Sequence, residues 1–153
     1  MTTATTRTPR QVFADLLHAS IDGDWDGLLA LYAEDTVIEM PFAPPGVPTV
    51  SDAATFTQRI KAMAGNRPWT FTSARDVRVH ETTDPEVIVA EYSLHGTVTA
   101  TGAPLVSTYA MVITVRDGKI VHSRDYGNPL ATAAALGRLP EVVAAYQAEN
   151  GAA

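Results

Sequence analysis

The chain contains no cysteine among its 153 residues. This absence excludes a disulfide framework, a thiolate nucleophile and cysteine ligation of a metal. The four histidines, His18, His80, His95 and His122, show neither the H-x-H nor the H-E-x-x-H spacing of metal sites. We therefore expect neither thiol redox chemistry nor a bound metal.

Positive charge and long apolar runs are also scarce. The 11 lysines and arginines are scattered and are outnumbered by 17 acidic residues, which gives a net charge of -6. A phosphate-backbone binder needs a clustered basic face, so nucleic acid is not an expected partner. No apolar stretch reaches 18 residues, and the opening "MTTATTRTPRQ" lacks the apolar core of a signal peptide. We expect a soluble, cytoplasmic protein without membrane contact.

Sequence motifs that bind cofactors or activate a serine are missing as well. The chain has no G-x-S-x-G elbow, no G-x-x-x-x-G-K phosphate loop and no G-x-G-x-x-G dinucleotide fingerprint. We expect no cofactor, so any reaction would have to be carried out by side chains alone.

Helical patterns fill the first part of the chain. Thr8-Pro9 is a typical helix start before an apolar stripe that ends at Asp22-Gly23. Asp24 can cap a second helix over 25–35, and Ser51-Asp52 can start a third over 52–64. A short strand over 36–40 is followed by "PFAPPGVP", whose four prolines predict a loop.

Strand patterns dominate from Trp69 onward. Four runs rich in β-branched and aromatic residues, 69–81, 86–100, 105–115 and 118–126, predict an antiparallel meander, and Asp117-Gly118 is the strongest hairpin signal. A further helix is expected after Asn128-Pro129. The fold class is α+β, with a strongly curved sheet wrapped around the helices. We expect one domain over 9–148, with tails at 1–8 and 149–153.

The last strand ends in "HSRDYGNPL", where Asp125 is the principal catalytic candidate. A two-residue turn at Asp117-Gly118 would pair Val115 with Ile120 and put Asp125 on the face of Ala110, Val112 and Val121. Apolar neighbours would raise the pKa of the carboxyl and suit it to acid–base work near neutral pH. The alternative is structural: Asp125 could pair with Arg124 or Arg75 or accept backbone hydrogen bonds.

Other candidate side chains lie on the neighbouring strands. His95 and Glu91 share one strand face, as an acid–base pair or as a solvated or dimer-facing stripe, and Tyr92 and Tyr109 are core aromatics or phenol donors. Glu39 precedes the proline loop and could face either the cavity or the surface. Phe42 belongs to a stiff apolar flap, which could cover a pocket mouth or pack on the core.

The stretches "DGDWDGLLALYAEDTVIEMPFAPPG" and "VRDGKIVHSRDYGNPL" resemble the SnoaL-like proteins of the nuclear-transport-factor-two-like (ketosteroid isomerase-like) superfamily, over about residues 10 to 145. "SRDYGNPLATAAALGRLPEV" is similar to the phenazine biosynthesis A/B proteins. The resemblance implies a conical barrel of helices and bent sheet with a deep central pocket, and it implies dimers. The catalytic acid of the phenazine proteins falls on Asp125, whereas their catalytic histidine on the third helix has no counterpart here.

These observations predict a cofactor-independent isomerase, cyclase or dehydratase for a small, largely apolar secondary-metabolite intermediate, polyketide-like as the resemblance implies. The expected catalytic residues are Asp125, Tyr92, His95 and Glu39, and the expected substrate-binding residues are Phe42, Trp69, Tyr109, Val112 and Val121. A non-catalytic ligand-binding or dimerisation module and an epoxide hydrolase are the alternatives. We expect a homodimer, because the open face of a long sheet needs cover.

Overall fold

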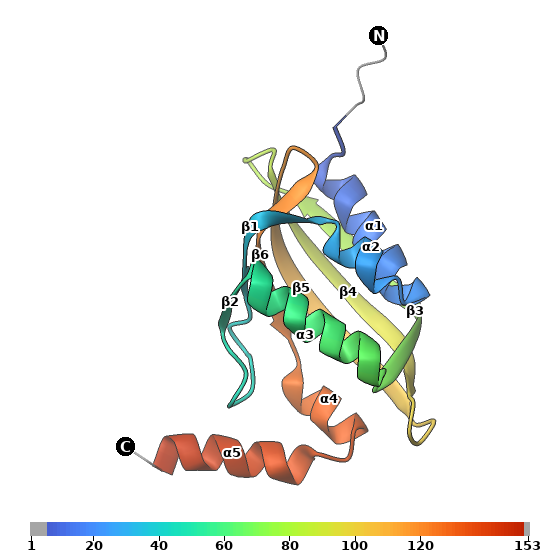
Figure 1. Ribbon diagram of the computed structural model, residues 1–153, viewed down its shortest axis with the longest axis vertical. Helices are drawn as coiled ribbons and strands as arrows, with labels where there is room; N and C mark the ends of the chain where they lie inside the picture. The colour runs from blue at the N-terminus through green and yellow to red at the C-terminus, as the bar shows by residue number, and fades with distance from the viewer. Residues whose placement is uncertain (1–5, 152–153) are drawn as a thin grey trace.

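The computed structural model describes residues 6–151 (Figure 1). Its helices are α1 (Pro9–Asp22), α2 (Trp25–Leu29), α3 (Ala53–Asn66), α4 (Pro129–Ala135) and α5 (Leu139–Gly151). Its strands are β1 (Tyr32–Glu39), β2 (Val50–Asp52), β3 (Trp69–Glu81), β4 (Val87–Val98), β5 (Pro104–Arg116) and β6 (Lys119–Gly127). Of the two expected tails, residues 1–5 and 152–153 lie outside the described part, while 149–151 belong to α5. The domain limits 9–148 stay a prediction.

The helix starts lie where the local sequence predicts them. Thr8 and Gln11 form a capping box at the start of α1, in which each side chain accepts the backbone N–H of the other. Asp24, Asp52 and Asn128 cap α2, α3 and α4 through side-chain oxygens that accept backbone N–H groups at 2.9, 2.8 and 3.1 Å. Pro129 stands at the first helical position of α4.

The second helix is shorter than expected, and this moves one aromatic residue into the sheet. The helix predicted over 25–35 ends at Leu29, and β1 begins at Tyr32. Tyr32 pairs with Ile120 of β6, and the Ile120 N–H donates to the Leu31 carbonyl at 2.8 Å. Pairing with a strand almost ninety residues later therefore overrides the local helical pattern.

One sheet of six strands carries the architecture, in the order β2-β1-β6-β5-β4-β3. The meander from β3 to β6 is antiparallel as expected, and the hairpin at Asp117-Gly118 has the positive φ angles, 50° and 73°, of a tight turn. β1 and β2 extend it, with β1 parallel to β6, so the sheet is mixed and open.

The three N-terminal helices cover the concave face of this sheet (Figure 1). Val12, Phe13, Leu16 and Leu17 of α1 pack with the alternate residues of β4 and β5 that face them, among them Tyr92, Leu94, Met111 and Ile113. Within residues 6–151, no helix has the length and apolar character needed to cross a membrane. The resulting α+β fold, helices inside a curved sheet, is the predicted class.

Candidate active site

Asp125 lies on the concave face of the sheet, near the end of β6, but its neighbours differ from those expected. The turn pairs Val115 with Ile120 as predicted, and Val121 is then an extra residue without a partner on β5. Every later pair is shifted by one position, so Asp125 stands opposite Met111. The expected register beyond the turn is therefore wrong, because it contained no bulge.

The Asp125 side chain is partly buried, and its carboxyl is incompletely hydrogen-bonded. Its Oδ1 atom is buried and has no hydrogen-bond partner. Burial raises the pKa of Asp125 to about 6, while hydrogen bonding by the neighbouring Ser123 hydroxyl and the positive charge of Arg59 act in the opposite direction. A carboxyl with this pKa changes its protonation state just below neutral pH, which suits a group that both removes and returns a proton.

Three tyrosine phenols are close enough to the carboxyl for its charge to affect them. Tyr92 and Tyr109 stack with ring centroids 5.3 Å apart, and the Tyr92 hydroxyl donates to Sδ of Met111 at 2.8 Å. Burial raises the pKa values of Tyr32, Tyr92 and Tyr109, and the negative charge of Asp125 raises all three further. The phenols therefore stay protonated. Those of Tyr32 and Tyr109 can donate hydrogen bonds to an oxygen atom bound beside them, and that of Tyr92 can do so when its hydroxyl turns from Met111.

Arg59 of α3 is the cation whose charge lowers the pKa of Asp125. Its guanidinium contacts Sδ of Met40 at 3.7 and 3.9 Å and is half-buried. Burial lowers the pKa of Arg59, and the charge of Asp125 opposes that shift. Arg59 thus favours the ionised form of Asp125 without forming a close ion pair with it, which leaves the carboxylate free to act as a base.

Four of the expected site residues do not lie beside Asp125: Glu39, His95, Val112 and Val121. Glu39 is on the outer face of β1, where it pairs with His122 at 3.0 Å and with Arg124 at 3.5 Å. His95 is on the outer face of β4, opposite to the face that Tyr92 shares.

Val112 also faces outward. Without the bulge it would lie on the same face as Asp125, but the extra residue in β6 places Asp125 on the opposite face of the sheet. Val121 is the bulge residue itself and is not opposite any β5 residue. The expectation that these two valines lie beside Asp125 is corrected accordingly. Glu91, for which pairing with His95 was one of two alternatives, lies on the outer face and bonds His80 at 2.8 Å.

The two remaining candidates line other parts of the molecule. Phe42 is 59% exposed in the loop between β1 and β2, with its ring 5.4 Å from that of Tyr126. It borders a surface pocket that includes Asn128 and Tyr146, next to the C-terminal helices. Trp69 packs on the hydrophobic core beside Phe71, with ring centroids 6.3 Å apart.

Two residues of the cluster, Tyr32 and Arg59, were not expected from the sequence. Tyr32 was assigned to the apolar stripe of a helix, whereas it begins a strand. Arg59 offered a signal that could have been used: it lies on the same helical stripe as Phe56, Ile60 and Met63, where an arginine has to be near a polar group of the core.

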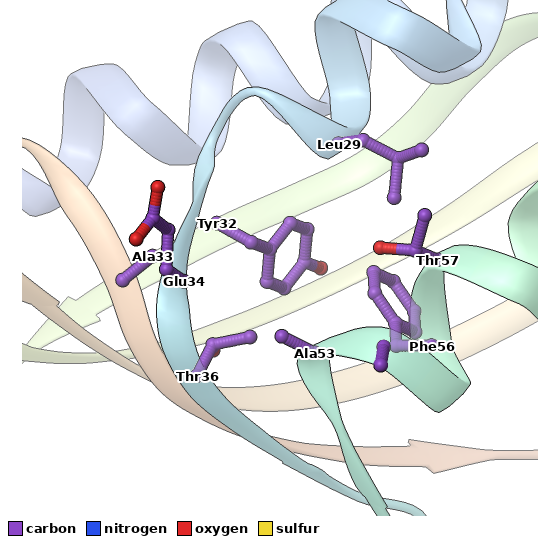
Figure 2. Close-up of a pocket in the computed structure, with 9 residues that line it drawn as sticks. Leu29, Tyr32, Ala33, Glu34, Thr36, Ala53, Phe56 and Thr57 are labelled. Carbon is purple, nitrogen blue, oxygen red and sulfur yellow. The ribbon is translucent and has the colours of Figure 1, made fainter.

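A groove of about 470 Å³ opens next to the cluster, between β1, α2 and the start of α3 (Figure 2). The Tyr32 ring lies across it and packs against Phe56 of α3, with ring centroids 4.7 Å apart. Thr36 of β1 and Ala53 of α3 lie on one side of that ring and Leu29 on the other (Figure 2). Tyr32 therefore lines this groove, and its phenol is also affected by the charge of Asp125.

Between residues 6 and 151, no three histidine, aspartate or glutamate side chains come together in an arrangement that could hold an ion. The chemistry that the described cluster offers is that of one carboxyl, three phenols and one guanidinium.

Comparison with known proteins identifies relatives of this chain. The chain matches the SnoaL-like domain over residues 13–123. An uncharacterized PhzA/B-like protein of Pseudomonas aeruginosa is 32% identical over 129 residues, which cover 84% of this chain and 89% of that protein.

Two solved structures show the same fold. A candidate isomerase from Bacillus subtilis is 30% identical with a TM-score of 0.77, over 84% of this chain and 92% of that one. A candidate polyketide cyclase from Xanthomonas campestris is 25% identical with a TM-score of 0.65, over 82% and 93%. The domain match ends two residues before Asp125, so the position of this carboxyl depends on the geometry described above. With 111 of 153 residues matched and a relative above 30% identity, this chain belongs to the SnoaL-like family.

Proposed function

We propose that this protein is an acid–base enzyme of the isomerase or cyclase type, in which Asp125 moves a proton on a small, largely apolar metabolite. The observation that carries the proposal is the Asp125 carboxyl itself, buried at Oδ1, without a hydrogen-bond partner and with a pKa of about 6. A structural aspartate would be expected to use its buried oxygen in an ion pair or a backbone hydrogen bond. An unsatisfied, titratable carboxyl is typical of a functional site.

The reaction that this cluster supports is proton abstraction beside a carbonyl group. The Asp125 carboxylate takes a proton from the carbon next to the carbonyl, and the electron pair of that C–H bond moves toward the carbonyl oxygen. Phenol donors at Tyr32, Tyr92 and Tyr109 would stabilise the negative charge on that oxygen. Protonated Asp125 then returns its proton to a second carbon in an isomerisation, or to the new alkoxide after a ring-closing carbon–carbon bond forms.

The substrate class follows from the surroundings of the cluster. Apolar and aromatic side chains outnumber charged ones there, and Arg59 is the one cation that affects Asp125 in the described chain. A neutral, oxygen-bearing substrate of polyketide type matches the polarity of these surroundings, and the candidate polyketide cyclase from Xanthomonas campestris has the same fold. His95 and Glu39 have no part in this proposal, because they lie on the outer face of the sheet.

Solvent-deuterium exchange into 2-tetralone tests the proposal without a known substrate. The protons beside its carbonyl exchange when a base removes them, and ¹H NMR follows their loss in D₂O. We expect the wild-type protein to accelerate this exchange, and Asp125→Asn to reduce the acceleration about 100-fold or more, the scale of a positioned general base. Asp35→Asn, which changes an exposed carboxyl on β1, is the matched control and should exchange like wild type.

Equal exchange rates for wild type and Asp125→Asn would contradict the proposal. Binding of 2-tetralone by the wild type without any acceleration would also contradict it, and would favour a ligand-binding module with the same fold.

A further inference from the structure

Four buried oxygen atoms without hydrogen-bond partners lie on one part of the sheet. Among the described residues they belong to Thr36, Ser51, Ser123 and Asp125. Ser51 and Ser123 both pair with Ile38, from β2 and β6, and residues in register on adjacent strands share a face. Thr36 is two positions before Ile38 and Asp125 two positions after Ser123, so all four side chains share the concave face of β2, β1 and β6.

Unpartnered buried hydroxyls are costly and therefore informative. Removing a hydroxyl from water without giving it a partner destabilises the folded protein, and native structures contain few such groups. Thr36 is only 1% exposed, Ser51 3% and Ser123 0%. Ser123 is close enough to Asp125 to lower the pKa of that carboxyl by hydrogen bonding, so Thr36 and Ser51 are the hydroxyls for which a bound molecule would supply the missing partners.

Thr36 connects this row to the groove of Figure 2. Its side chain lines the groove together with Tyr32 and Phe56, whose rings form its aromatic wall (Figure 2). Tyr32 pairs with Ile120 of β6, the strand that carries Asp125, and the charge of Asp125 adds to burial in raising the pKa of the Tyr32 phenol. Thr36 at the groove and Asp125 thus lie on the same concave face of two adjacent strands.

We propose that the groove between β1 and α3 is a subsite for the distal ring of the substrate, in which the Thr36 hydroxyl hydrogen-bonds a neutral oxygen on that ring. This inference rests on the proposed function for its reacting end at Asp125. It adds a second point of recognition, which selects substrates by length and by the presence of a distal hydroxyl or carbonyl.

The size and charge of the region define the ligand. Thr36 and Asp125 are four strand positions apart, or about 13 Å at the rise of an extended strand. A molecule that reaches both needs at least two rings. Glu34, at the exposed edge of the groove, disfavours an anionic ring, and the Tyr32 and Phe56 rings favour a planar one.

Three phenols of graded length test the subsite by NMR titration of the protein: 4,4′-dihydroxybiphenyl, 4-phenylphenol and phenol. The first two share the biphenyl skeleton and differ by one hydroxyl. We expect wild type to bind the dihydroxy compound about 5- to 10-fold more tightly than 4-phenylphenol, the effect of one neutral hydrogen bond. Thr36→Val should abolish this preference, because valine keeps the shape of threonine and lacks its hydroxyl.

A second variant tests the groove by filling it. Ala54 lies at the exposed edge of the groove, so Ala54→Trp should fold normally and weaken both biphenyls about 10-fold while leaving phenol unchanged. Ala62→Trp, on an exposed position of the same helix outside the groove lining, is the matched control and should change none of the three.

Thermal unfolding separates recognition from packing. Thr36→Val should have an unchanged or higher Tm, because it removes an unpartnered hydroxyl. Ser20→Ala should have a lower Tm, because the Ser20 hydroxyl donates to the Leu16 carbonyl at 2.8 Å.

The inference is overturned if Thr36→Val keeps the wild-type preference for the dihydroxy compound, or if Ala54→Trp binds the biphenyls like wild type. Because these are binding measurements, they do not depend on turnover. A normal deuterium exchange with an unchanged biphenyl preference would reject the subsite alone, and the reverse result would reject the catalytic role of Asp125 alone.

Discussion

Replacing Asp125 by asparagine should stabilise the protein at neutral pH while it removes activity. The substitution keeps the size of the side chain and removes its charge. The folded-state pKa of Asp125 is about 6, against an ordinary value of 3.8, because burial disfavours the charged form. The folded state therefore holds the proton more strongly than the unfolded state does.

The pH dependence follows from this difference. Between about pH 3.8 and 6 the folded protein binds more protons at Asp125 than the unfolded chain, so the free energy of unfolding falls as pH rises through this interval. The loss is complete above pH 6. A shift of about 2 pH units, at about 1.4 kcal/mol each, corresponds to about 3 kcal/mol.

Urea unfolding of wild type and Asp125→Asn at pH 4 to 8 measures this effect. We expect nearly equal free energies of unfolding near pH 4 and a variant more stable by up to about 3 kcal/mol at pH 7, equivalent to roughly 6 to 12 °C in Tm. Asp35→Asn should show no comparable rise. A variant that is less stable at pH 7, or a difference that is the same at every pH, would refute the reasoning and indicate a paired, structural aspartate.

Four further outcomes are expected. Arg59→Met removes the cation that favours ionised Asp125, so the midpoint of the pH profile of tetralone exchange should move up by about one unit; an unmoved midpoint would contradict this role. Tyr92→Phe should slow exchange about 10-fold with little change in Tm, and an unchanged rate would exclude Tyr92 as a donor. Gly96→Ala places a β-carbon against the Thr70 carbonyl of β3 and should lower the free energy of unfolding by about 3 kcal/mol or more, whereas a wild-type urea midpoint would argue against that close approach. Sedimentation should give about twice the 16.3 kDa chain mass, and a monomer mass at micromolar concentration would reject a homodimer.

Helix starts were predictable because their signals are local. A capping side chain and the N–H it accepts are three residues apart, as for Asp24 with Gly27 and for Asp52 with Thr55, so the sequence contains both partners within one turn. The same holds for the Asp117-Gly118 hairpin, whose two residues adopt the required positive φ angles.

The register of β6 was not predictable beyond its turn. One extra residue, Val121, reverses the face of every later residue relative to β5, because side chains alternate with a period of two. A valine within an apolar run gives no sign of a bulge. The expectation of apolar neighbours for Asp125 holds although their identities were wrong, because the concave face offers Met111 and the stacked tyrosines in place of Ala110.

Tyr32 and Arg59 were missed for a related reason. Both reach the Asp125 cluster through contacts between distant segments: Tyr32 through the parallel pairing of β1 with β6, and Arg59 through α3 crossing the concave face (Figure 1). Parallel pairing leaves no turn signal between its strands. Glu39 was expected in the site and lies outside it. Its pairing with His122 and Arg124 on the outer face depends on the same strand pair, β1 with β6, which the sequence did not predict.

The central claim is that the interior of the sheet holds Asp125 as a titratable carboxyl poised near neutral pH. A ¹³C NMR titration of the aspartate carboxyl carbons measures this directly, with the Asp125 signal assigned by its absence from the Asp125→Asn spectrum. The account predicts a titration midpoint near pH 6 for this one carboxyl. A midpoint near 4, the ordinary value for an aspartate in water, would contradict it.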